Sequence, residues 1–180
     1  MAHRFKVIHG GPYPHFITMT IVRWLPVFVS GEYFNIMLSS LNYVREHRGL
    51  AVHAYVIMPT HIHAVVTAGQ DDLPAIMRDV KKFTARRIYE QAEQDGSKLH
   101  TWMFRKAAES EPRSRFKVWQ DEYHPEVTYT PEFFQQKVDY MHRNPVRKGL
   151  VADAVKWYYS SASVYAGGEA GPLEIEWLEW

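Results

Sequence analysis

Residues 51–67 read AVHAYVIMPTHIHAVVT and decide the fold. Two strand-like runs, residues 51–58 and 61–67, are separated by a single Pro-Thr dipeptide, and so short a loop joins neighbouring antiparallel strands. Alternate side chains of a strand leave opposite faces, so His61 and His63 share one face. The stretch therefore predicts a β-hairpin that presents two imidazoles side by side.

The sequence around this hairpin alternates between strand and helix patterns. Residues 15–22 predict a first strand, and residues 32–46 predict an amphipathic helix that ends near Gly49. After the hairpin, residues 73–93 predict a long helix. Five apolar side chains of this helix fall within one arc: Ile76, Met77, Val80, Phe83 and Ile88.

The second half of the chain is less regular. Residues 94–115 are polar, and we expect a mobile excursion there with at most a short helix. Residues 116–120 predict another strand, and residues 153–165 predict a last helix. The order of elements predicts an α+β sandwich, an antiparallel sheet with helices mainly on one face.

Composition limits the class of protein. We expect a single domain over residues 1–180, with a core at about 14–166 and a C-terminal tail at about 167–180. Cysteine is absent, which excludes disulfides and thiolate metal sites. No apolar run approaches the roughly 20 residues that span a bilayer, so we expect a cytoplasmic protein without membrane contact. A net charge of +1 means that any case for nucleic-acid binding must rest on local clusters.

The clearest helix of the second half carries a tyrosine and an asparagine on one face. Thr130 predicts its cap, and the helix is expected to end at Asn144 because the next residue is Pro145. Tyr140 and Asn144 are one turn apart and project away from the apolar stripe. That stripe consists of Phe134, Val138 and Met141. On spacing alone, Tyr140 could equally fill a boundary position and Asn144 could cap the helix end.

The histidine pair is ambiguous by itself. Two imidazoles on one strand face can bind one metal ion, but the same pattern also occurs on solvated sheet faces. Two histidines also leave a metal site without its third ligand. Spacing therefore does not decide between a metal site and a polar surface.

Two motifs together resemble a known family. Residues 59–66 (PTHIHAVV) and residues 139–151 (DYMHRNPVRKGLV) are similar to the single-tyrosine HUH transposases, particularly the REP-associated tyrosine transposases of the IS200-like group. The segments KKFTARRI, VWQ and WYYSSASVY also match, so the resemblance runs from about residue 15 to residue 165. Two departures are Thr60, where asparagine is common, and the length of residues 94–115.

The resemblance implies a fold, a reaction and a site. It implies the ferredoxin-like HUH endonuclease/transposase fold and a transposase that cleaves and rejoins single-stranded DNA next to hairpins through a 5′-phosphotyrosine intermediate. Tyr140 corresponds to the nucleophile, and His61, His63 and Asn144 correspond to the ligands of a divalent metal, Mg²⁺ or Mn²⁺. The implied partner is DNA containing palindromic repeats. We expect a monomer, with a dimer as the alternative, and His142 is a weak candidate for accepting the tyrosine proton.

Local clusters of cations fit a DNA substrate. We assign seven basic residues to DNA binding: Arg78, Lys81, Lys82 and Arg86 on the long helix, and Arg143, Arg147 and Lys148 beside the proposed site. A solvated helix face is the alternative for the first four.

Two other functions remain open from the residues alone. A ferredoxin-like RNA- or single-strand-binding module without catalysis would present stacking aromatics on exposed strands. A zinc hydrolase using His61 and His63 would need a further histidine or carboxylate.

Overall fold

The computed structural model describes residues 13–69, 73–109, 114–121 and 125–178. Within these ranges, four antiparallel strands form one sheet in the order β2-β3-β1-β4. The strands are β1 (His15–Thr20), β2 (Leu50–Met58), β3 (His61–Ala68) and β4 (Glu126–Val127). This arrangement confirms the predicted α+β fold with its antiparallel sheet and the predicted β2–β3 hairpin.

The hairpin places the histidines on an inner strand. β3 pairs with β2 on one side and with β1 on the other. In the β1–β3 register, Thr20 lies opposite His61 and Thr18 lies opposite His63. Because β3 is bonded on both sides, its backbone offers a rigid base for the two imidazoles.

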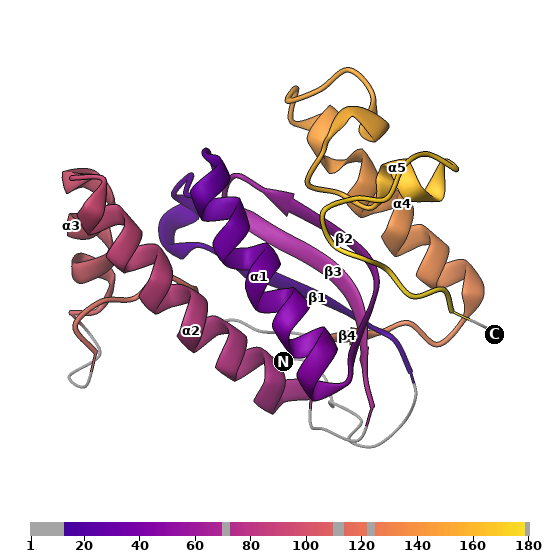
Figure 1. Ribbon diagram of the computed structural model, residues 1–180, viewed down its shortest axis with the longest axis horizontal. Helices are drawn as coiled ribbons and strands as arrows, with labels where there is room; N and C mark the ends of the chain where they lie inside the picture. Colours follow the sequence, from indigo (N-terminus) through magenta and orange to yellow (C-terminus); the bar gives the residue numbers. More distant parts are fainter. Residues whose placement is uncertain (1–12, 70–72, 110–113, 122–124, 179–180) are drawn as a thin grey trace, which may run out of the picture.

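Helices cover both faces of the sheet. α1 (Gly31–Arg48) and α2 (Leu73–Gln94) lie side by side over one face, and α4 (Pro131–Arg147) lies apart from them, next to β2 (Figure 1). The larger apolar cluster joins α1, α2 and α3 (Lys98–Ala107) to the face that contains Ile62 and Ala64. A smaller cluster joins α4 to the face that contains Val65. Side chains alternate along β3, so His61 and His63 face α4.

The smaller cluster explains why α4 docks where it does. Its members from the helix are Phe134, Val138 and Met141, which are the apolar stripe predicted from the sequence. Their partners on the sheet are Phe16, Ala54, Val56, Met58 and Val65. Burial of this stripe fixes the rotation of α4 about its axis. That rotation determines the directions in which Tyr140 and Asn144 project.

Residues 94–115 contain more order than the polar composition predicts. α3 is a ten-residue helix within this segment, and its Phe104 is fully buried in the larger cluster. Residues 110–113 of the predicted excursion lie outside the described residues. Phe104, with the partly buried Met103 and Ala107 beside it, anchors a helix whose other side chains are largely polar.

Residues 116–120 do not form the predicted strand. Only Trp119 forms an isolated bridge, with Ile21, and its indole N–H donates to Thr84 at 3.0 Å. The backbone N–H of Lys117 donates to the carbonyl of Phe104 instead of to a strand. The segment still bonds near the end of β1, where the Val22 N–H donates to the Val118 carbonyl and the Gln120 N–H donates to the Thr20 carbonyl, both at 2.8 Å. The short edge strand β4 pairs with the other end of β1, at His15 and Phe16.

The predicted ends of two helices differ from those in the structure. α4 continues through Pro145 to Arg147, because Pro145 removes a single donor and the helical bonding resumes with the Lys148 N–H donating to the Asn144 carbonyl at 3.0 Å. The last predicted helix divides into η2 (Ala154–Lys156) and α5 (Ala162–Tyr165). Between these two, the backbone of residues 159–161 bonds to β2, with Ser160 bridging Val56, so the helix is interrupted.

The prediction that Phe83 belongs to the buried face of α2 is wrong. Phe83 was expected in the apolar arc of α2 but is exposed, whereas Ile76, Met77, Val80 and Ile88 are buried as predicted. Among the helices in the described ranges, none is both long and apolar enough to cross a membrane.

Candidate active site between β3 and α4

His61 and His63 are buried and each is oriented by a threonine. Their ring centroids are 4.7 Å apart. The Nδ1 atom of His61 lies 2.9 Å from the Thr60 hydroxyl, and the Nδ1 atom of His63 lies 2.9 Å from the Thr18 hydroxyl. When Nδ1–H donates to the hydroxyl, Nε2 carries a free lone pair, which is the arrangement of a metal-binding histidine.

Burial keeps both imidazoles neutral. It lowers the pKa of His61 to about 4, with a smaller contribution from the charge of Lys148. It lowers the pKa of His63 to about 3, helped by His61 and Lys137. A neutral imidazole is the form that coordinates a cation, so neither ring needs to lose a proton near pH 7.

α4 brings an amide and a phenol to the histidines. The buried Asn144 side chain places its amide nitrogen 3.3 Å from Nε2 of His61. Rotation of the amide by a half turn brings its oxygen to the same position, where it can face a shared cation. The Tyr140 ring is 43% exposed, and its centroid lies 5.6 Å from that of His63. The four predicted catalytic and metal-binding residues therefore meet in one place.

Cations line the α4 side of this site. The guanidinium carbon of Arg147 lies 5.7 Å from the centroid of the Tyr140 ring. Lys148 is close enough to His61 to lower its pKa. Lys137 was not predicted from the sequence. Its Nζ lies 4.8 Å from the centroid of the Phe16 ring and 2.6 Å from the Glu126 carboxylate. Its position three residues before Tyr140 on one helix was the available signal.

The basic residues of α2 are not brought to the site. α2 packs on the opposite face of the sheet from the histidines. Arg86 pairs with Glu90 at 2.8 Å, and Lys81 donates to the Gln120 carbonyl at 2.6 Å. Arg78 pairs with Asp79 at 3.3 Å, and Lys82 is exposed. Their assignment to DNA binding stays a prediction.

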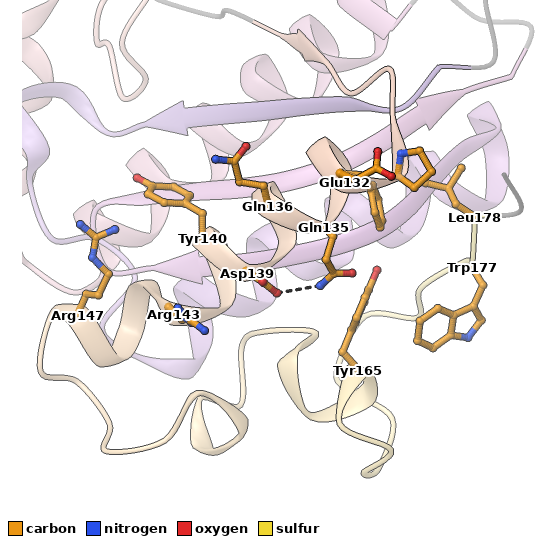
Figure 2. Close-up of a pocket in the computed structure, with 12 residues that line it drawn as sticks. Glu132, Gln135, Gln136, Asp139, Tyr140, Arg143, Arg147, Tyr165, Trp177 and Leu178 are labelled. Carbon is orange, nitrogen blue, oxygen red and sulfur yellow. Dashed lines mark hydrogen bonds between the residues drawn. The ribbon is translucent and has the colours of Figure 1, made fainter.

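A groove runs along the outer side of α4 and ends at Tyr140. It has a volume of about 980 Å³ and does not include the histidines in its lining. Figure 2 shows Tyr140 and Arg147 at one end and Tyr165 and Trp177 at the other, with Gln135 donating to Asp139 between them. Arg143 also lines this groove. Tyr165 and Trp177 were not singled out from the sequence, because they join α4 only through the folded C-terminal segment.

The structure argues against the weak assignment of His142. This ring is buried, its Nε2 lies 2.8 Å from the Ser161 hydroxyl, and it packs against Tyr165. Burial lowers its pKa to about 4, partly offset by Asp139. Its bonds point into the protein toward β2, so it is not placed to accept the Tyr140 proton.

The two alternative functions find little support. A zinc hydrolase needs a third histidine or a carboxylate, and no group of three His, Cys, Asp or Glu side chains suited to a metal occurs among the described residues. An RNA-binding sheet needs exposed aromatics on its strands. The aromatic residues of the described strands, Phe16 and Tyr55, are both buried.

Comparison with known proteins shows which proteins the chain resembles in sequence and in fold. No family model matches the chain. The REP-associated tyrosine transposase of Escherichia coli strain K12 is 22% identical over 162 residues, which cover 88% of this chain and 81% of that protein. The solved structure of a REP-associated tyrosine transposase bound to a REP hairpin has a TM-score of 0.66 and 18% identity, and the match covers 100% of this chain and 95% of the other. The chain is therefore similar in sequence to REP-associated tyrosine transposases over most of its length and has their fold.

Proposed function

We propose that this chain is a transposase that cleaves and rejoins single-stranded DNA next to hairpins through a phosphotyrosine at Tyr140. The observation that carries the proposal is the convergence of Tyr140 and Asn144, from α4, on His61 and His63, from β3. The similarity to a REP-associated tyrosine transposase supports the same reaction class.

The proposed reaction uses the Tyr140 oxygen as nucleophile. The phenol oxygen attacks phosphorus, a Tyr140–phosphate bond forms at the 5′ side, and the bond to the 3′ oxygen breaks. The phenol loses a proton and the departing 3′ oxygen gains one, so no co-reactant is consumed. A 3′-hydroxyl that later attacks the phosphotyrosine reverses these changes and rejoins the strands.

His61, His63 and Asn144 would hold the divalent cation. The residues fit such an ion because both Nδ1 atoms are occupied by threonine hydroxyls, both rings are neutral, and the amide can turn its oxygen inward. Bound there, Mg²⁺ or Mn²⁺ supplies Lewis-acid polarisation of the scissile phosphate. The role of the three side chains is to fix the position of the ion next to the Tyr140 ring.

The proposed substrate is a hairpin with a single-stranded flank. The similar protein of known structure is bound to a REP hairpin, which supports a hairpin as the partner. Arg147 lies 5.7 Å from the Tyr140 ring and the charge of Lys148 acts on His61, so both cations are placed to contact the phosphates beside the cleaved bond. One chain supplies the nucleophile and all three ligands, which supports a monomer as the active unit.

The test is to trap the covalent intermediate. The chain is incubated with Mn²⁺ and labelled oligonucleotides that carry palindromic hairpins with unpaired flanks, and products are separated on a denaturing gel. We expect a protein–DNA adduct whose nucleotide maps by mass spectrometry to the peptide that contains Tyr140. An adduct on any other tyrosine, or cleavage by Tyr140→Phe at the wild-type rate, overturns the proposal.

A further inference from the structure

A strained turn lies directly beside the histidine pair. Arg23 and Trp24, in the short helix η1 (Val22–Trp24), have φ angles of 55° and 54°. They are the only residues other than glycine with positive φ in the part of the chain that the structure describes. The left-handed conformation is unfavourable for any residue with a Cβ atom, and neither arginine nor tryptophan adopts it readily.

Backbone hydrogen bonds hold this turn in place. The N–H of Ile21 donates to the Thr60 carbonyl at 2.9 Å, and the N–H of Val27 donates to the Pro59 carbonyl at 2.8 Å. The N–H of Trp24 closes the turn on the Ile21 carbonyl at 3.0 Å. The turn is thereby fixed to the loop between β2 and β3, immediately before His61.

The turn presents a large aromatic ring to solvent at the site. Trp24 is 57% exposed, and its ring centroid lies 5.5 Å from that of His61 at an interplanar angle of 73°. Other tryptophans of this chain are equally exposed, but Trp24 is the one held open by a left-handed backbone beside the histidines. Strain that keeps an apolar ring out of the core, beside the proposed reaction centre, points to a ligand.

We propose that Trp24 stacks on an unpaired base of the DNA strand that enters the active site, which rests on the proposed function for the identity of the strand. The position of the ring favours a nucleobase over an apolar partner. Trp24 contacts His61, which belongs to the site proposed to act on a DNA phosphate, so a base next to that phosphate would come within reach of the indole. An exposed aromatic face at such a place suits single-stranded nucleic acid, because stacking accepts any base.

The inference gives Trp24 a role that the four site residues do not have. Tyr140, His61, His63 and Asn144 act on a phosphate, which is identical at every step of a strand. A ring that binds the adjacent base would instead set the position of the strand, so the phosphate that follows that base is the one presented to Tyr140. Trp24 is in this sense a positioning residue.

Fluorescence titration of the full chain with a deoxythymidine oligomer tests the inference. We expect the oligomer to quench indole fluorescence, and we expect Trp24→Phe to lose most of the quenching. Trp24→Ala should bind the oligomer about 5- to 150-fold more weakly, which is the loss of about 1–3 kcal/mol expected for one stacked base. Trp102→Phe and Trp102→Ala are matched controls, since Trp102 on α3 is 58% exposed and makes no ring contact with the histidines.

An oligomer of equal length made of abasic sites separates stacking from charge. Wild type should bind it as weakly as Trp24→Ala binds the thymidine oligomer, and the variant should lose no further affinity on it. Arg23→Gly should release the strain and raise the denaturation temperature, because glycine adopts positive φ freely. The same variant should bind the thymidine oligomer more weakly, because the turn no longer holds Trp24 in place. Equal binding of both oligomers by wild type, or unchanged binding by Trp24→Ala, overturns the inference.

The outcomes also separate this inference from the proposed function. Adduct formation at Tyr140 together with Trp24-independent binding leaves the transposase proposal standing and overturns the stacking role. Trp24-dependent binding without any adduct supports stacking and contradicts the cleavage reaction. Failure to bind single-stranded DNA of any kind overturns both.

Discussion

Thr18 on β1 lies directly opposite His63 on β3, and its hydroxyl is 2.9 Å from Nδ1 of that histidine. The strand register therefore supplies a hydrogen-bond partner for Nδ1 of His63. A bond of this kind fixes both the tautomer and the orientation of the imidazole. Neighbouring strands of the sheet thus prepare the site before any ligand arrives.

Thr18→Val should weaken metal binding while the fold is kept. The substitution removes the hydroxyl that orients His63 with little change in shape, and loss of such a partner typically lowers metal affinity 10- to 100-fold. Calorimetric titration with Mn²⁺ measures the change, and Thr18→Ser should restore the affinity. Thr67→Val is the matched control. The Thr67 hydroxyl forms a hydrogen bond of 3.0 Å to another histidine, His53, which is not part of the site. Equal losses for both valine variants would contradict the prediction.

Mn²⁺ should raise the denaturation temperature of the wild-type chain. An ion held by β3 and α4 together binds only the folded state, which contributes about 2.7 kcal/mol at 100 times its dissociation constant. Differential scanning calorimetry with and without chelator measures the shift. We expect no shift in the double variant His61→Ala, His63→Ala. The exposed His47, replaced by alanine, is the control, and a shift that survives in the double variant would refute the site.

Tyr140→Phe should abolish strand cleavage with little effect on stability. The hydroxyl sits on a half-exposed ring, and its removal leaves the contacts with His63 and Phe16 in place. We expect the free energy of unfolding to change by less than about 1 kcal/mol. Urea denaturation and a denaturing-gel cleavage assay are run on the same preparation. Tyr158→Phe, also at an exposed position, should cleave like wild type.

DNA affinity should decrease with salt, and the two groups of cations should differ. Each phosphate contact contributes about 0.7–0.9 to the slope of log affinity against log salt. Arg147→Ala with Lys148→Ala should lower this slope by about 1.5, because both cations lie beside the proposed phosphate position. Lys82→Ala with Arg86→Ala measures the contribution of α2 on the opposite face. An unchanged slope in the first double variant would remove those two residues from the interface.

Stability should fall as the pH drops below about 6.5, in part through His53. Burial lowers the pKa of this ring from its ordinary value of 6.5, although its bond to the Glu176 carbonyl opposes the shift. The unfolded chain then binds the proton first, so the folded state loses stability as the pH falls from 6.5 toward the folded pKa. His53→Gln should reduce this pH dependence in urea titrations at pH 7.5 and 5.5. His47→Gln, at an exposed site, is the control.

The sequence was most informative where one local rule decided the structure. The period of two in β3 was sufficient to place His61 and His63 on one face, and the apolar stripe of α4 was sufficient to orient Tyr140. Local rules failed where tertiary contacts outweighed them. Residues 118–120 pair with residues 20–22 through one isolated bridge only, and the Trp119 indole is anchored to Thr84 on α2. Packing against β2 holds α4 intact across Pro145. No pattern of residue types predicts the left-handed turn at Trp24, because that turn depends on bonds to the β2–β3 loop.

Pro145 within α4 also has a kinetic consequence for the site. The Asn144–Pro145 peptide bond is trans in the folded chain, and the last turn of α4 forms only around a trans bond. An unfolded chain holds roughly 10–30% of such bonds in the cis form, and conversion takes tens to hundreds of seconds. Chains that begin folding with this bond in the cis form can assemble the sheet and both histidines first. In these chains Asn144 reaches its place beside His61 only after isomerisation, so the proposed metal site is completed later than the fold that surrounds it.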